Sequence, residues 1–131
     1  MDKLSTFRAF VGPAQRQAIY SAMKGEEGAW FRSKVAELIA MLEAMPKTYE
    51  QDGKGEQAIA YLHYFTAGCD WYITERDIDA DGEGQVQAFG TADLGYGPEL
   101  GYISIVEILE CGAELDLHFT PAALSQIRKA A

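Results

Sequence analysis

Three aspartates at alternate positions are the clearest candidate for chemistry in the sequence: Asp77, Asp79 and Asp81, followed by Gly82. This spacing is that of the first half of a calcium-binding loop, because Ca²⁺ takes several carboxylate oxygens and the glycine permits a sharp turn. The twelfth position, where such a loop needs a bidentate glutamate, is Ala88. We therefore favour an acidic hairpin turn with Asp81-Gly82 at its tip, and we keep a divalent-metal site as the alternative.

Two histidines, His63 and His118, are the next candidates. Asp116 and His118 would share one face of an extended segment, and with Glu114 they would form half of a metal site or an acid–base pair. A structural histidine with a single hydrogen bond is the other interpretation of each. No HExxH or GxSxG motif occurs, so no catalytic residue is assigned and we favour a non-enzymatic protein.

A glycine-rich stretch begins within the predicted third strand and continues past it, with Gly90, Gly95, Gly97 and Gly101. It does not predict a phosphate-binding loop, because no GK[ST] motif follows and Asp93 and Glu99 would repel phosphate. We interpret it as a loop that needs left-handed backbone conformations and close approach of the chain.

The negative charge is concentrated in one part of the chain. The net charge is −9, yet residues 1–48 carry seven Lys/Arg against five Asp/Glu, and residues 49–119 carry two against fifteen. Such a field repels nucleic acid and attracts a basic protein partner or cations. A surface kept acidic for solubility is the competing interpretation. The aromatic residues of the predicted strands are assigned to packing, because base-stacking platforms lie in basic grooves.

Location follows from hydropathy. No apolar run reaches the length of a membrane span, and the N-terminus lacks the apolar stretch of a signal peptide. We therefore expect a cytoplasmic protein that does not bind membranes. Cys69 and Cys111 are far apart in sequence, and two reduced thiols are the favoured interpretation.

The apolar periodicity changes from helical to strand-like along the chain, which predicts one α+β domain over residues 1–131. Residues 1–45 form its helical part and residues 46–131 its acidic α+β part. Pro13 begins a helix that runs to about Lys24, and a second helix spans about 29–45. An antiparallel sheet of about four strands follows, with short C-terminal helices. The expected strands are 59–65, 71–75, 86–91 and, as a strand or merely extended chain, 115–119.

Two helix starts are expected late in the chain. Ser104 and Glu107 form a capping box. Thr120 and Pro121 fit the cap and first turn of a final helix that ends near Lys129.

Several blocks of sequence occur in the order seen in one family: Trp71-Tyr72-Ile73-Thr74-Glu75, the stretch 89–104 and Asp116-Leu117-His118-Phe119. Over about residues 45–121 the chain resembles a bacterial family of uncharacterised small acidic proteins, often encoded on plasmids and integrative elements. The resemblance implies a compact α+β domain and a mobile-element setting, and it implies no reaction. It also makes a candidate pocket of the residues that match family positions: Glu75, Asp93, Glu99 and His118.

Two functional hypotheses follow. The first is an accessory protein of a mobile element that binds a partner protein through its acidic face. The second is a divalent-metal-binding domain or metal-dependent enzyme, with calcium as one candidate ion at Asp77, Asp79 and Asp81. The helices of residues 1–45 pack on the chain's own sheet or mediate a homodimer.

Overall fold

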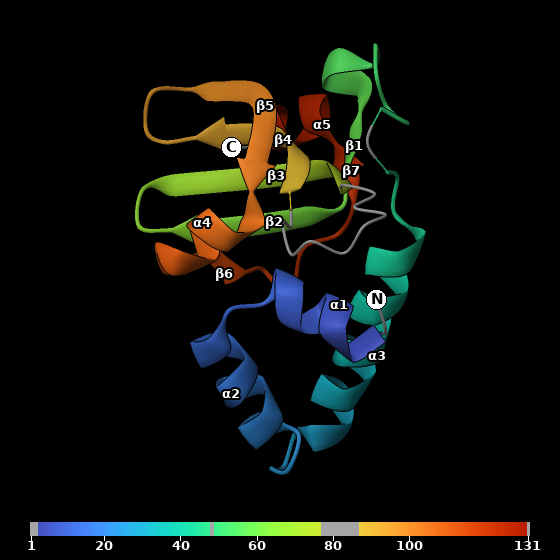
Figure 1. Cartoon of the computed structure of the whole chain (residues 1–131), viewed down its shortest axis with the longest axis vertical. Helices are drawn as coiled ribbons and strands as arrows, with labels where there is room; N and C mark the ends of the chain where they lie inside the picture. The colour runs from blue at the N-terminus through green and yellow to red at the C-terminus, as the bar shows by residue number, and fades with distance from the viewer. Residues whose placement is uncertain (1–2, 48, 77–86, 131) are drawn as a thin grey trace.

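The computed structural model describes residues 3–47, 49–76 and 87–130, and these form an α+β fold (Figure 1). Three helices occupy one end of the molecule, and a five-stranded antiparallel sheet occupies the other. The predicted fold class is confirmed, with five strands in place of about four.

The N-terminal part consists of α1 (Lys3–Phe10), α2 (Pro13–Ala22) and α3 (Gly28–Ala44). Pro13 is in the first turn of α2, where its fixed φ suits the helix and its missing N–H costs nothing. The 3.6-residue period of α3 buries one face of that helix, as predicted. Helix α1 was not expected, and it forms because burial of its aromatic residues stabilises a short helix that would be marginal alone.

The main sheet has the order β5-β4-β3-β2-β6, and every neighbouring pair is antiparallel. Its strands are β2 (Leu62–Thr66), β3 (Cys69–Arg76), β4 (Gln87–Asp93), β5 (Pro98–Ser104) and β6 (Glu114–Leu115). Long strands therefore come from residues 62–104, and the last strand is only a two-residue addition to one edge.

A two-stranded sheet pairs β1 (Ile59–Ala60) with β7 (Ala122–Ala123). The predicted strand 59–65 is therefore two elements. Along the chain, β1 follows η1 (Gly55–Gln57) and β7 precedes α5 (Leu124–Ala130). Helix α4 (Ile105–Glu110) follows β5.

Two expectations about helix starts have different outcomes. The Ser104 hydroxyl accepts the Glu107 N–H at 3.2 Å, so the predicted N-cap of α4 is confirmed. The start at Thr120 and Pro121 is wrong. Helix α5 begins at Leu124, because the two preceding residues pair with β1 and the Leu124 N–H donates to the Ala58 carbonyl at 3.0 Å.

The hydrophobic core lies between the helices and one face of the main sheet, which we call the inner face. Leu62, Tyr64, Trp71 and Ile73 alternate along β2 and β3 and point into this core. They meet apolar side chains of α1, α3 and α4, and the buried Tyr64 hydroxyl donates to the Phe10 carbonyl. The helices of residues 1–45 thus cover the chain's own sheet.

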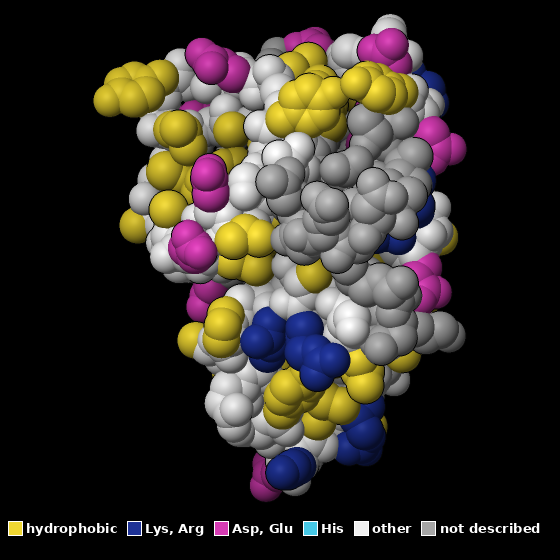
Figure 2. Space-filling model, in the orientation of Figure 1, with side chains coloured by type: hydrophobic (Ala, Val, Ile, Leu, Met, Phe, Trp, Pro, Cys, Tyr) yellow, Lys and Arg dark blue, Asp and Glu magenta, His cyan; other side chains and the backbone are white. Residues whose placement is uncertain are grey.

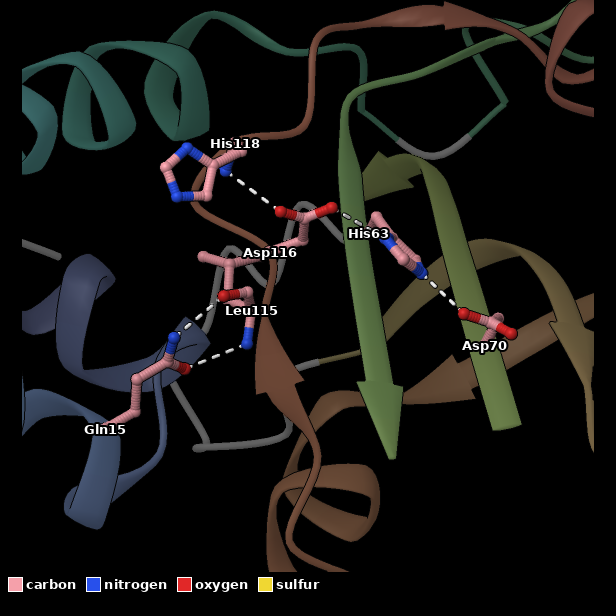
Figure 3. Close-up of polar contacts among 6 residues, drawn as sticks. All are labelled: Gln15, His63, Asp70, Leu115, Asp116 and His118. Atoms are coloured by element: carbon pink, nitrogen blue, oxygen red, sulfur yellow. Dashed lines mark hydrogen bonds and ion pairs between the residues drawn. The ribbon is translucent and has the colours of Figure 1, made fainter. Parts of the chain in front are cut away.

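The short strand β6 is held from both sides. On one side it pairs with β2. On the other side the Gln15 side chain of α2 donates to the Leu115 carbonyl and accepts the Leu115 N–H, both at 2.8 Å (Figure 3). One side-chain amide therefore replaces a neighbouring strand and covers this part of the sheet edge.

Cys69 and Cys111 are both free thiols. Within the described ranges, no helix is long and apolar enough to cross a membrane. The predicted acidic turn at Asp81-Gly82 lies outside the described residues.

Candidate functional site

The second face of the main sheet, which we call the outer face, carries several polar and charged side chains where β2 and β3 of the inner face carry buried aliphatic and aromatic ones. His63 is opposite Tyr72 across β2 and β3, and Tyr72 is opposite Thr91 across β3 and β4. Asp70 is opposite Asp93 in the same register. Because directly paired residues point to the same side of a sheet, these five side chains form one contiguous patch.

His63 lies between two carboxylates (Figure 3). Its Nδ1 is 3.0 Å from Asp116 Oδ2, and its Nε2 is 2.7 Å from Asp70 Oδ1. A neutral imidazole has one N–H, so only the imidazolium form donates to both carboxylates. The bridge therefore ties the segment after β6 to strands β2 and β3.

Tyr72 is the second central residue of this patch. Its ring stacks on the His63 imidazole, with centroids 4.5 Å apart and planes 6° from parallel. Burial raises the pKa of the Tyr72 hydroxyl, and three nearby carboxylates raise it further: Asp70, Asp116 and Asp93. Tyr72 therefore stays a neutral phenol and offers an aromatic surface in an acidic environment.

A cavity of about 250 Å³ lies beside this patch, between the sheet and α5. Asp70 and Asp93 supply carboxylates, and Leu124 and Ile127 of α5 supply apolar surface. Its complete lining is Asp70, Tyr72, Thr91, Asp93, Pro98, Leu124 and Ile127. Such a combination suits a cation attached to an aliphatic chain, because the charge and the methylene groups both find partners.

Of the four predicted pocket residues, Asp93 alone lines this cavity. Asp93 also accepts the N–H groups of Gly95 and Gly97, at 2.9 and 3.2 Å, and so orders the glycine loop. Glu75 is near the other end of β3 and accepts the Tyr49 N–H. Glu99 is exposed and pairs with Ala92. Because consecutive residues of a strand point to opposite sides of the sheet, Ala92 and Glu99 lie on the side opposite Asp93.

His118 does not form an acid–base pair with Asp116, which was one of the two interpretations kept for it. Asp116 Oδ1 accepts the backbone N–H of His118 at 2.9 Å, and the His118 ring points away from that carboxylate (Figure 3). The ring lies 5.5 Å from Trp30 of α3 instead. The pair fails because the chain turns after β6, so residues 116 and 118 do not share the face of a strand.

No three His, Cys, Asp or Glu side chains gather closely enough to hold a metal ion within the part of the chain that the structure describes. Asp77, Asp79 and Asp81 lie outside that part, so a metal site there stays a prediction.

The family model described as protein of unknown function (DUF2958) matches residues 33–130, which is most of the chain. The chain belongs to this family. No curated protein and no solved structure matches it. The matched part of the DUF2958 chain contains both sheets, α4, α5 and the whole outer-face patch, whereas α1 and α2 lie before it.

The centre of the patch in this DUF2958 protein is the bridge from His63 to Asp70 and Asp116. The sequence made His63 a candidate but did not predict these two partners. One signal was available, because a hairpin with a two-residue turn at Ala67-Gly68 sets His63 opposite Tyr72. The partner Asp116 had no such signal, since it is 53 residues away in sequence and reaches His63 only through the pairing of β6.

Proposed function

We propose that this protein is a non-enzymatic, cytoplasmic interaction module of a mobile genetic element, and that its outer face binds a basic segment of a partner protein. The observation that carries the proposal is the cavity beside α5, where Asp70 and Asp93 flank apolar and aromatic surface. The mobile-element setting comes from the family resemblance of the sequence.

The charge distribution supports a basic partner. Figure 2 shows Asp and Glu side chains mainly over the sheet end and Lys and Arg side chains mainly over the helical end. A lysine or arginine in the cavity would place its charge near two aspartates and its methylene groups against Leu124 and Ile127. Complementary charge of this kind guides encounter and selects partners.

The geometry of His63 supports binding in preference to catalysis. A general base needs a ring nitrogen within reach of substrate. Both nitrogens of His63 already face carboxylates, at 3.0 and 2.7 Å. We therefore assign His63 to holding the patch together.

The test is the affinity for a fluorescent ten-residue peptide with alternating lysine and leucine, measured by anisotropy. We expect saturable binding that weakens as salt is raised from 50 to 500 mM, because screening shortens the reach of exposed charges. We expect Asp70→Asn and Asp93→Asn each to weaken binding roughly two- to fivefold, the range for one partly exposed charge pair.

Glu99→Gln is the matched control, because it removes the same charge from the same sheet on the opposite side. It should leave the affinity within error of the wild-type value. Equal losses in all three variants would mean that only net charge matters, and this result would contradict a defined binding face.

A further inference from the structure

A second, smaller cavity opens at the other end of the outer face. It measures about 50 Å³ and is lined by three aromatic rings and two carboxylates: Tyr49, Phe89, Tyr102, Asp52 and Glu75. A bulge between Ile73 and Glu75 creates this grouping, because it shifts Glu75 to the side of its pairing partner Phe89. Tyr102 faces Phe89 from β5, edge to face, with ring centroids 5.4 Å apart.

Glu75 is the unusual member of this set. Its side chain belongs to a residue only 4% exposed, and among the described residues no lysine or arginine forms an ion pair with it. Lys47, two residues before Tyr49, is engaged elsewhere, because its Nζ donates to the Glu43 and Met45 carbonyls. A carboxylate taken out of water without a cation is costly, so this cavity favours a positively charged occupant.

Tyr49 lines the cavity and has a strained backbone. Its φ is +72°, a left-handed conformation that side-chain-bearing residues seldom adopt. Glu75 accepts its N–H, and its hydroxyl is 3.0 Å from the Tyr102 hydroxyl. These contacts fix Tyr49 beside Glu75 and Tyr102 at the cavity, and strain of this kind is found where a chain clamps a ligand.

We propose that this cavity binds a primary alkylammonium group, supplied by a lysine side chain of the partner. Aromatic faces attract cations, and the carboxylates accept N–H bonds that a quaternary ammonium cannot donate. The volume admits a few water molecules, which suits an ammonium head. The choice of a lysine of the partner as the source of the ammonium group rests on the proposed function. The preference of the cavity for an alkylammonium group does not.

The experiment is an NMR titration of the ¹⁵N-labelled full chain with n-butylammonium, with n-butanol as the neutral control of equal shape. We expect saturable shifts at Tyr49, Glu75, Phe89 and Tyr102 with the amine only. Glu75→Gln should weaken binding by about tenfold, because it removes a buried opposite charge. Asp52→Asn, at an exposed position, should weaken it about threefold and keeps the test valid if the Glu75 variant fails to fold.

Equal shifts with n-butanol, or unchanged affinity in Asp52→Asn, would overturn the proposal. Tighter binding of tetramethylammonium than of n-butylammonium would overturn the choice of a primary ammonium. Butylammonium binding without peptide binding would support this site and contradict the proposed function, and peptide binding without butylammonium binding would do the reverse.

Discussion

The two faces of the main sheet are built from the same strands and differ in almost every property. The inner face carries fully buried residues such as Leu62, Tyr64 and Ile73, and three helices close over it. The outer face carries His63, Asp70 and Asp93, with two cavities beside α5 and Tyr49. The larger hydrophobic core lies on the inner face, whereas the outer face packs only a smaller cluster, around Leu124, against Tyr72. The difference indicates that most of the stability comes from the inner face and that the outer face has room for binding chemistry.

Truncation of one apolar residue on each face should give the largest difference in stability between the two faces. Ile73→Ala should lower the free energy of unfolding by about 3 kcal/mol, because it leaves a cavity in the core. Leu100 is half-exposed on the outer face, so Leu100→Ala should change the free energy of unfolding by less than about 0.5 kcal/mol. Urea denaturation measures both, and similar losses would mean that the outer face is also a structural core.

Alkaline pH should act on stability through the inner face. Burial raises the pKa of the Tyr64 hydroxyl from its ordinary value of 10.0, so the unfolded chain ionises at a lower pH than the folded chain. The Tyr64 contribution is therefore complete below pH 10 and is lost as pH rises further, by at most about 1.4 kcal/mol per pH unit.

Tyr64→Phe should flatten this decline between pH 10 and 11.5, as measured by urea denaturation at each pH. Tyr96→Phe is the control, since Tyr96 is 97% exposed and has no buried hydroxyl to ionise. An unchanged decline in Tyr64→Phe would show that the buried phenol is not its source.

The His63 bridge should contribute less than the core and should contribute unequally through its two carboxylates. We expect Asp116→Asn to cost about 1 kcal/mol of unfolding free energy and Asp70→Asn about half as much. The reason is exposure, because the Asp116 side chain is 28% exposed and also binds the His118 N–H, whereas Asp70 is 46% exposed. A larger loss from Asp70→Asn would mean that the bridge is centred on β3 and does not anchor the segment after β6.

Local signals in the sequence predicted the elements that local interactions stabilise. The period of α3, the proline of α2 and the Ser104 cap of α4 each act within a few residues, and each is found as expected. Elements that depend on distant pairing were predicted less well: β1 was merged with β2, β6 is much shorter than the expected strand 115–119, and no strand was predicted at β5 or β7. Strands β1, β6 and β7 have two residues each. Strands β1 and β7 pair with each other, and β6 pairs with β2 and with the Gln15 side chain.

The same distinction applies to the candidate site. Asp93 was singled out from the sequence and lines the larger cavity, while Glu75 lines the smaller one. Their surroundings could not be predicted, because the bulge before Glu75 decides which face it joins. The partners Tyr49 and Tyr102 are 53 residues apart, so no local pattern connects them.

If the outer face binds basic partners at two places, the affinity for a peptide depends on the spacing of its lysines. The cavities are four residues apart along β4, from Asp93 to Phe89, or about 13 Å. An extended peptide places lysines i and i+4 on one side at this spacing, and lysines i and i+3 on opposite sides. In NMR titrations, the i, i+4 peptide should shift the amides of both cavities together and bind at least about threefold more tightly, the effect of one further ion pair. Equal affinity of the two peptides, or shifts at Glu99 and Glu110 in place of the outer face, would contradict the account.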